Sequence, residues 1–208
     1  MKTLALLLAA VVVAAASAQA ARADGDPASD YLLGYKIFLP YDAKFPPKQS
    51  AELSGLVAAA NKAGFPIRVA IIWSAYDMGS VTTLWKKPKT YARFLGLELS
   101  FVYKQRLLVV MANGFGFNWP KHSTTGEYAL LDKIAIPPGA GGLLTAASAA
   151  VQQLAAAGGV KVSAPSNVTT PSQRNDHDRV VILAAALAAL AVVAAARFFM
   201  RRRRTAQP

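Results

Sequence analysis

The chain has 208 residues, a formal net charge of +12 and no cysteine. The absence of cysteine excludes disulfides, thiol catalysis and zinc-thiolate sites. Much of the positive charge lies near the two ends, and residues 24–179 hold 16 basic against 11 acidic residues, a net charge of +5. This charge is spread along the sequence, which is typical of a soluble domain and does not indicate a nucleic-acid-binding protein.

The N-terminal segment has the pattern of a secretory signal. Lys2 precedes an apolar run at residues 4–16, which is too short to span a bilayer. Small residues follow, with A-x-A cleavage patterns that end at Ala20 and at Ala23. We predict a signal peptide at residues 1–23, cleaved after Ala23 or Ala20, and the alternative is an uncleaved anchor.

A second apolar run lies near the C-terminus, at residues 180–200. Its length suits a transmembrane helix, and the arginines at positions 201–204 would keep the tail, residues 201–208, in the cytoplasm. The polar residues 163–179 form a predicted stalk. The sequence therefore predicts a single-pass protein of the cell membrane whose domain, residues 24–162, lies outside the cytoplasm.

Within this domain, the first expected elements are a short strand at residues 35–39 and a helix at residues 48–63. Gly64 follows that helix and suits the left-handed geometry of a helix end. The next strand, IRVAIIW at residues 67–73, is almost continuously apolar, as a strand covered on both faces should be. Trp73 at its end is expected in the core.

A second helix is expected at residues 89–103 and a third strand at residues 106–112. The helix has one apolar stripe, formed by Tyr91, Phe94, Leu95, Phe101 and Val102. Helices between successive strands are typical of parallel crossovers, so the pattern predicts an α/β three-layer sandwich with a mostly parallel sheet. Residues 121–142 read as a loop with a short helix, followed by a last helix at residues 142–157.

The stretch LLVVMANGFGFNWP, residues 107–120, has two interpretations. Gly114 and Gly116 could belong to a phosphate-binding loop, but no third glycine and no helix start follow. Asn113-Gly114 is the preferred pair for a type I′ turn, and apolar residues alternate after it. A β-hairpin is therefore favoured, with Phe115, Phe117 and Trp119 on one face of the sheet.

The order of these parts resembles the TPM domain family. The resemblance is carried by the strand IRVAIIW, by Tyr91-Ala92 in the helix KTYARFLGLEL, and by LLVVM with the hairpin ANGFGF. It implies an exported α/β domain with a single membrane span, in a family that contains phosphatase-like, metal-binding and accessory proteins. Lys104-Gln105-Arg106 and Asn113-Gly114 stand where members often have W-x-x-G and Asp-Arg, so no active site is carried over.

Three polar residues follow predicted strands, namely Asp42, Asp77 and Asn113. Carboxyl ends of parallel strands share one edge of a sheet, where α/β proteins bind ligands. Two carboxylates and an amide oxygen could hold Ca²⁺ or Mg²⁺. The alternative, which we favour, is that the two aspartates are turn residues and Asn113 belongs to the hairpin turn.

A basic cluster, formed by Lys86, Lys87, Lys89 and Arg93, is the candidate site for a partner. These side chains could dock an acidic partner or lipid headgroups, although a solvated helix face is the simpler interpretation. His122 is read as a lone surface histidine.

The function predicted from the sequence is a membrane-anchored, non-catalytic binding or accessory module of the cell envelope, attached beside an envelope protein complex. The alternative is a metal-dependent, phosphatase-like hydrolase that uses the carboxylates at the strand ends.

Overall fold

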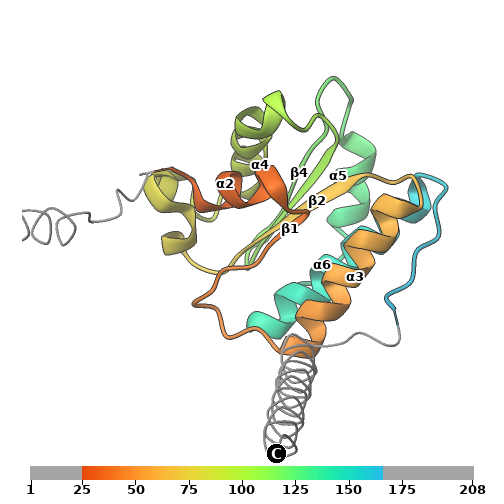
Figure 1. Cartoon of the computed structure of the whole chain (residues 1–208), viewed down its shortest axis with the longest axis horizontal. Helices are drawn as coiled ribbons and strands as arrows, with labels where there is room; N and C mark the ends of the chain where they lie inside the picture. The colour runs from red at the N-terminus through yellow and green to blue at the C-terminus, as the bar shows by residue number, and fades with distance from the viewer. Residues whose placement is uncertain (1–24, 166–208) are drawn as a thin grey trace, which may run out of the picture.

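The computed structural model describes residues 25–165 (Figure 1). The predicted signal peptide, most of the predicted stalk, the predicted transmembrane helix at residues 180–200 and the predicted cytoplasmic tail lie outside the described residues. Among the helices of residues 25–165, none combines the length and the hydropathy that crossing a bilayer requires.

The described chain is a mixed α/β domain. Helix α2 (Pro27–Gly34) precedes the short strand β1 (Ile37–Phe38), which is followed by α3 (Pro47–Lys62) and β2 (Ile67–Ile72). The 3₁₀ segment η1 (Ala75–Leu84) leads to α4 (Pro88–Glu98) and η2 (Leu99–Phe101). Strands β3 (Arg106–Met111) and β4 (Gly114–Asn118) then form a hairpin, and the helices α5 (Thr125–Leu131) and α6 (Ala140–Ala157) complete the domain.

The four strands form one sheet in the order β1-β2-β3-β4. Strands β1, β2 and β3 are parallel, as the helical connections predicted, and β4 is antiparallel to β3. Ile67 pairs with Arg106 and Leu107 pairs with Asn118, so the starts of β2 and β3 lie beside the end of β4. We call this the amino edge of the sheet; the opposite, carboxyl edge carries the ends of β1, β2 and β3.

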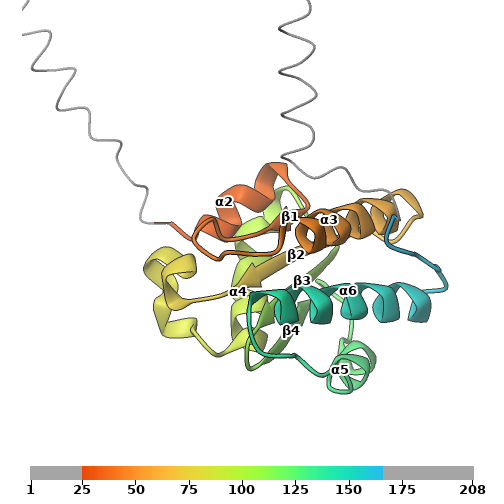
Figure 2. The same ribbon diagram turned by 90° about the horizontal axis from the view of Figure 1, so that it is seen from below.

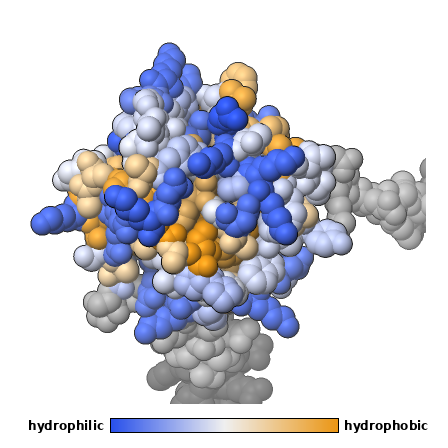
Figure 3. Space-filling model, turned by 180° about the vertical axis from the view of Figure 1, so that it is seen from behind, coloured by the Kyte–Doolittle hydropathy of each residue, from blue (hydrophilic) through white to orange (hydrophobic). Residues whose placement is uncertain are grey.

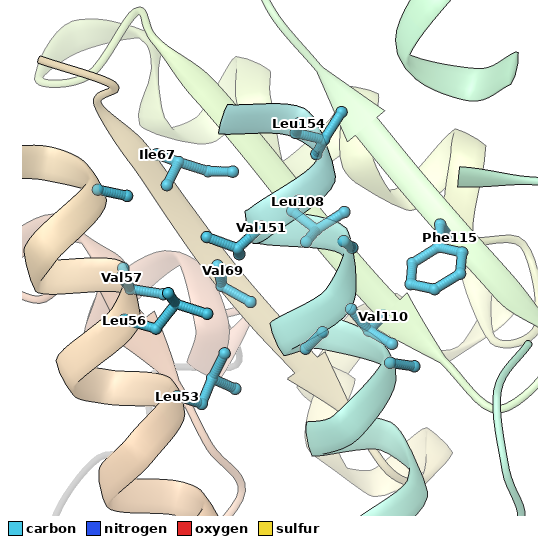
Figure 4. Close-up of a cluster of buried hydrophobic side chains, with 14 of the residues drawn as sticks. Leu53, Leu56, Val57, Ile67, Val69, Leu108, Val110, Phe115, Val151 and Leu154 are labelled. Atoms are coloured by element: carbon cyan, nitrogen blue, oxygen red, sulfur yellow. The ribbon is translucent and has the colours of Figure 1, made fainter. Parts of the chain in front are cut away.

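Helices cover both faces of the sheet (Figure 2). On one face, α3 and α6 pack on the strands through a core that includes Leu56, Val69, Val110 and Val151 (Figure 4). On the other face, α2 and α4 enclose a second core around Leu32, Ile72 and Leu95. Five of the six β2 residues are buried, which agrees with its continuous apolar sequence because both of its faces are covered.

The β-hairpin is confirmed, but the predicted turn is wrong. Met111 pairs with Gly114, so the two loop residues are Ala112 and Asn113 instead of Asn113 and Gly114. Within residues 25–165 only Lys86 and Lys121 among the non-glycine residues have positive φ, so this is not a type I′ turn. Gly114 instead opens β4 with a φ of 148°.

The alternation along β4 is confirmed. Phe115 and Phe117 belong to the α3/α6 core. Gly116 faces α4, where a Cβ atom would lie 1.9 Å from the Pro88 carbonyl oxygen and 2.8 Å from the Ala92 Cβ. Only a residue without a side chain lets α4 pack this closely on the strand.

Two expectations about apolar residues are wrong. Phe101 and Val102 are 95% and 62% exposed, because α4 ends at Glu98 and the chain turns into η2 before the predicted stripe is complete. Trp73 is 39% exposed, because β2 ends one residue before it. The segments α2 and η1 were not predicted from the sequence.

Candidate functional site

At the carboxyl edge, the polar side chains named by the sequence bind the backbone. The Asp77 carboxylate accepts hydrogen bonds from the backbone N–H groups of Trp73 and Ser74, at 2.7 and 2.6 Å. The Asn113 side-chain amide donates to the Lys86 carbonyl oxygen at 2.7 Å, while Asp42 is exposed in the loop after β1. Asp77 therefore stabilises the turn in which it lies, whereas Asn113 joins the hairpin loop to the segment before α4.

No group of three or more His, Asp or Glu side chains in residues 25–165 is arranged to hold a metal ion. The proposed site of Asp42, Asp77 and Asn113 contains only two such residues, so its cation binding stays a prediction. Binding there would have to compete with the two N–H donors on Asp77.

A buried carboxylate that the sequence did not reveal lies next to η1. Asp26 begins α2 and is 4% exposed, and both of its oxygens accept from the Tyr91 hydroxyl, at 2.7 and 2.8 Å. Burial raises the pKa of Asp26 to about 6, although the Tyr91 and Ala28 hydrogen bonds oppose this rise. Burial and the neighbouring Asp26 also raise the pKa of the Tyr91 hydroxyl. The pair joins α2 to α4 and therefore has a structural role.

The predicted basic cluster lines a groove beside the edge strand β4. One cavity, of about 440 Å³, lies between α4, the end of β4 and α5, and an adjoining one, of about 490 Å³, lies beside the hairpin. Lys89 lines both of them. We call the two cavities together the basic groove; its charged side chains are Lys87, Lys89, Arg93, Lys121 and Asp132.

Four cations and one carboxylate give the basic groove a positive potential. The only ion pair within residues 25–165 joins Lys48 to Glu52, so none of the four cations is paired there. Lys87, Lys89, Arg93 and Lys121 are all exposed. Figure 3 shows the side of the molecule on which β4 and α5 lie, where hydrophilic side chains border a hydrophobic strip.

Inside this groove, Tyr128 of α5 forms hydrogen bonds with the outer edge of β4. Its hydroxyl accepts from the Phe117 backbone N–H at 2.8 Å and donates to the Phe117 carbonyl at 3.0 Å. The ammonium of Lys89 lies 4.6 Å from the centre of the Tyr128 ring. Because Tyr128 occupies both backbone groups of Phe117, another strand cannot pair at this position, and side chains must provide recognition.

At the amino edge, aromatic rings stack on two arginines. The Arg106 guanidinium lies 4.2 Å from the centre of the Phe65 ring and 3.8 Å from that of Trp119. His122 stacks on Trp119 at 3.7 Å, and two planar groups this close to one ring must lie on its opposite faces. On the other face of the sheet, Arg68 lies 4.0 Å from the Tyr103 ring centre.

The two arginines are partly removed from water. Burial lowers the pKa of both Arg68 and Arg106 below the usual arginine value. One terminal nitrogen of Arg68, Nη1, is buried and has no hydrogen-bond partner within the described part of the chain. Tyr103 links the two by donating from its hydroxyl to the Arg106 carbonyl at 2.9 Å.

Comparison of the chain with protein-family models, with curated proteins and with solved structures finds no match. The functional conclusion therefore rests on the geometry of the described residues.

Sequence reasoning identified part of the groove. Lys87, Lys89 and Arg93 of the predicted partner-binding cluster line it, whereas Lys86 contributes its carbonyl to Asn113 and is not among the lining residues. Lys121 and Tyr128 were missed because they follow in the segment that we read as a loop. Only the hairpin and α5 bring them beside α4, and no local motif marks that arrangement.

Proposed function

We propose that this protein is a non-catalytic binding module, anchored in the cell membrane with its domain outside the cytoplasm, which holds an acidic segment of an envelope partner in the basic groove. The observation that carries this proposal is the set of four cations around one groove without an ion pair among residues 25–165. The anchor, the export signal and the three-layer TPM-like architecture come from the sequence patterns.

The shape of the groove favours a protein segment over a membrane surface. The two cavities adjoin one another along β4 and are concave, with Tyr128 and Trp119 as part of the floor and walls. An extended acidic chain can follow such a groove and place successive carboxylates beside successive cations. A flat layer of lipid headgroups would reach the exposed lysines but would leave the concave part unfilled.

The binding of a labelled hexaglutamate peptide to the full chain in dodecyl maltoside micelles tests this proposal by fluorescence anisotropy. The triple variant K89Q/R93Q/K121Q removes three groove cations. The matched control K36Q/K44Q/K62Q removes the same charge from exposed lysines outside the groove. Because groove contacts act at short range, we expect the groove variant to weaken binding by about tenfold or more, and the control by about twofold or less.

Salt provides the second part of this test. Raising the ionic strength from about 0.05 to 0.5 M should weaken binding to the unmodified chain much more than binding to the groove variant. Equal loss of affinity in the groove variant and in the control would show that the peptide responds to net charge alone, and the proposal would be wrong. Binding to vesicles with anionic lipid, but not to the peptide, would replace the acidic segment by a membrane surface.

A further inference from the structure

A third cavity lies next to the stacked arginine at the amino edge of the sheet. It measures about 410 Å³ and lies between the start of β3, α5 and the C-terminal end of α6. A volume of this size is in the range of small-molecule sites. We call it the Arg106 pocket; its main side chains are Phe65, Arg106, Trp119, Glu127, Leu130 and Leu154.

The guanidinium of Arg106 is fixed in orientation but is free to bind a ligand. The rings of Phe65 and Trp119 both lie against it, with ring centres 4.2 and 3.8 Å from its central carbon, and these two contacts hold the group in place. Its N–H donors point outward from the rim of the guanidinium plane. Among residues 25–165, the Arg106 side chain forms no hydrogen bond and no ion pair, and it lines the cavity.

A guanidinium that two rings hold in place, and that has no hydrogen-bond partner within residues 25–165, suits a carboxylate. The two oxygens of a carboxylate match two parallel N–H donors of arginine, which gives a bidentate pair of charge-assisted hydrogen bonds. The two rings hold the guanidinium in place in the free protein, so little side-chain entropy is lost when a ligand binds.

The rest of the pocket supplies an apolar wall and one negative charge. Leu154 is 2% exposed, and with Leu130 it offers apolar surface for the body of a ligand. Glu127 lines the same cavity and favours the charged form of Arg106 from beyond ion-pair distance. Its charge would repel a second carboxylate on the ligand, and it could accept a hydrogen bond from an ammonium group.

We propose that the Arg106 pocket binds small monocarboxylates with an apolar body, through a bidentate pair with Arg106 and contact with Leu130 and Leu154. Free organic acids and apolar α-amino acids share this chemistry, and the ammonium group of the amino acid would lie toward Glu127. The site is separate from the basic groove, although Trp119 lines both.

The test measures binding to the full chain in dodecyl maltoside micelles by isothermal titration calorimetry. The probes are 3-phenylpropanoate, L-phenylalanine and 3-phenylpropan-1-ol, which share an apolar body and differ in their charged groups. We expect both carboxylates to bind with a dissociation constant below about 1 mM and the alcohol to bind at least about tenfold more weakly, because it cannot pair with Arg106. Tighter binding of phenylalanine than of phenylpropanoate identifies amino acids as the ligands, and the reverse order identifies free acids.

Substitutions at Arg106 test whether the carboxylates bind in this pocket. Arg106→Gln should weaken the better carboxylate by about tenfold or more, and Arg106→Lys should weaken it too, because lysine keeps the charge but lacks the planar fork. Lys36→Gln is the matched control, since it removes one positive charge from an exposed side chain that lines neither the Arg106 pocket nor the basic groove, and it should change the affinity by about twofold or less.

A second variant keeps Arg106 in place. Gly126 lies in α5 at the pocket, and a Cβ atom there would meet no other atom within 4 Å. Gly126→Leu replaces a poor helix former by a good one and should obstruct the cavity, so we expect weaker binding by about fivefold or more in a folded protein. If Arg106→Gln does not fold, Gly126→Leu and the comparison with the alcohol still test whether the pocket binds carboxylates.

Three results would overturn the proposal. The first is the absence of a binding heat for both carboxylates up to about 10 mM. The second is equal affinity for the alcohol and for phenylpropanoate. The third is unchanged affinity in both Arg106→Gln and Gly126→Leu.

Discussion

The two edges of the sheet differ in what their charged side chains contact. At the carboxyl edge, the Asp77 carboxylate binds backbone N–H groups, and near η1 the Asp26 carboxylate binds Tyr91. At the amino edge, Arg106 lies against two aromatic rings and bonds to no acceptor within the described residues. The cations of the basic groove, which follows β4 from the hairpin to its end, likewise form no ion pair within those residues. The carboxylates maintain the fold, whereas the cations remain available to a ligand.

The largest expected effect is a change of folding stability with pH that comes from Asp26. Its pKa is about 6 in the folded protein, above its ordinary value of 3.8. The folded state therefore holds this proton more tightly than the unfolded state does. The resulting stabilisation is fully present below pH 3.8 and is lost as the pH rises through about 6, a change of roughly 3 kcal/mol. Chemical denaturation at a series of pH values should show this slope, and Asp26→Asn should remove that part of it. An equal dependence of stability on pH in the unmodified protein and in Asp26→Asn would contradict the structural role of a buried Asp26.

A smaller loss of stability is expected for Tyr91→Phe. The substitution removes the hydroxyl that donates to the buried carboxylate and leaves the ring packed in the core. Loss of a hydrogen bond to a buried charged group should lower the free energy of unfolding at pH 7 by about 2 kcal/mol. Tyr35→Phe, at a ring that is 60% exposed, is the control and should be nearly neutral. The outcome that counts against this account is an equal effect of the two substitutions in urea denaturation.

Asp77→Ala separates a structural role from a metal site at the carboxyl edge. Because the carboxylate accepts two backbone N–H groups, its removal should cost about 1 kcal/mol of stability. We expect millimolar Ca²⁺, Mg²⁺ or Mn²⁺ to leave the melting temperature of the unmodified protein unchanged. A rise that disappears in Asp42→Asn and Asp77→Asn would instead support the metal-dependent hydrolase.

The smallest effect is expected at Lys121, whose backbone has a φ of 65° at the side of the basic groove. A left-handed conformation is unfavourable for a residue with a side chain, so Lys121→Gly should stabilise the fold by up to about 1 kcal/mol. The same change should weaken binding of hexaglutamate, because a groove cation is lost. A variant that gains stability and keeps its affinity would show that Lys121 does not contact the ligand.

Much of the fold follows from local sequence patterns. The apolar runs of β2 and β3 and the helices between them predict the parallel strands, because each signal lies within one short segment. The end of α4 at Glu98 was not predictable in this way, since Leu99, Phe101 and Val102 continue an apolar pattern that the tertiary structure does not use as one helix.

The candidate sites were less predictable than the fold. The position after a strand selected Asp42, Asp77 and Asn113. In the structure, Asp77 binds the backbone of its own turn and Asn113 binds the Lys86 carbonyl. Phe65, Arg106 and Trp119 come from three different loops or strand ends, and only the strand register brings them together. A spacing pattern within one segment cannot reveal a stack of this kind.

The most direct test of the difference between structural carboxylates and available cations is a chemical-shift titration of the ¹⁵N-labelled full chain in micelles with hexaglutamate. We predict that the shifts concentrate at Lys87, Lys89, Arg93 and Lys121, with little change at Asp42 and Asp77. Shifts that concentrate around Asp42 and Asp77, or that are spread evenly over all exposed lysines, would contradict the assignment of binding to the basic groove.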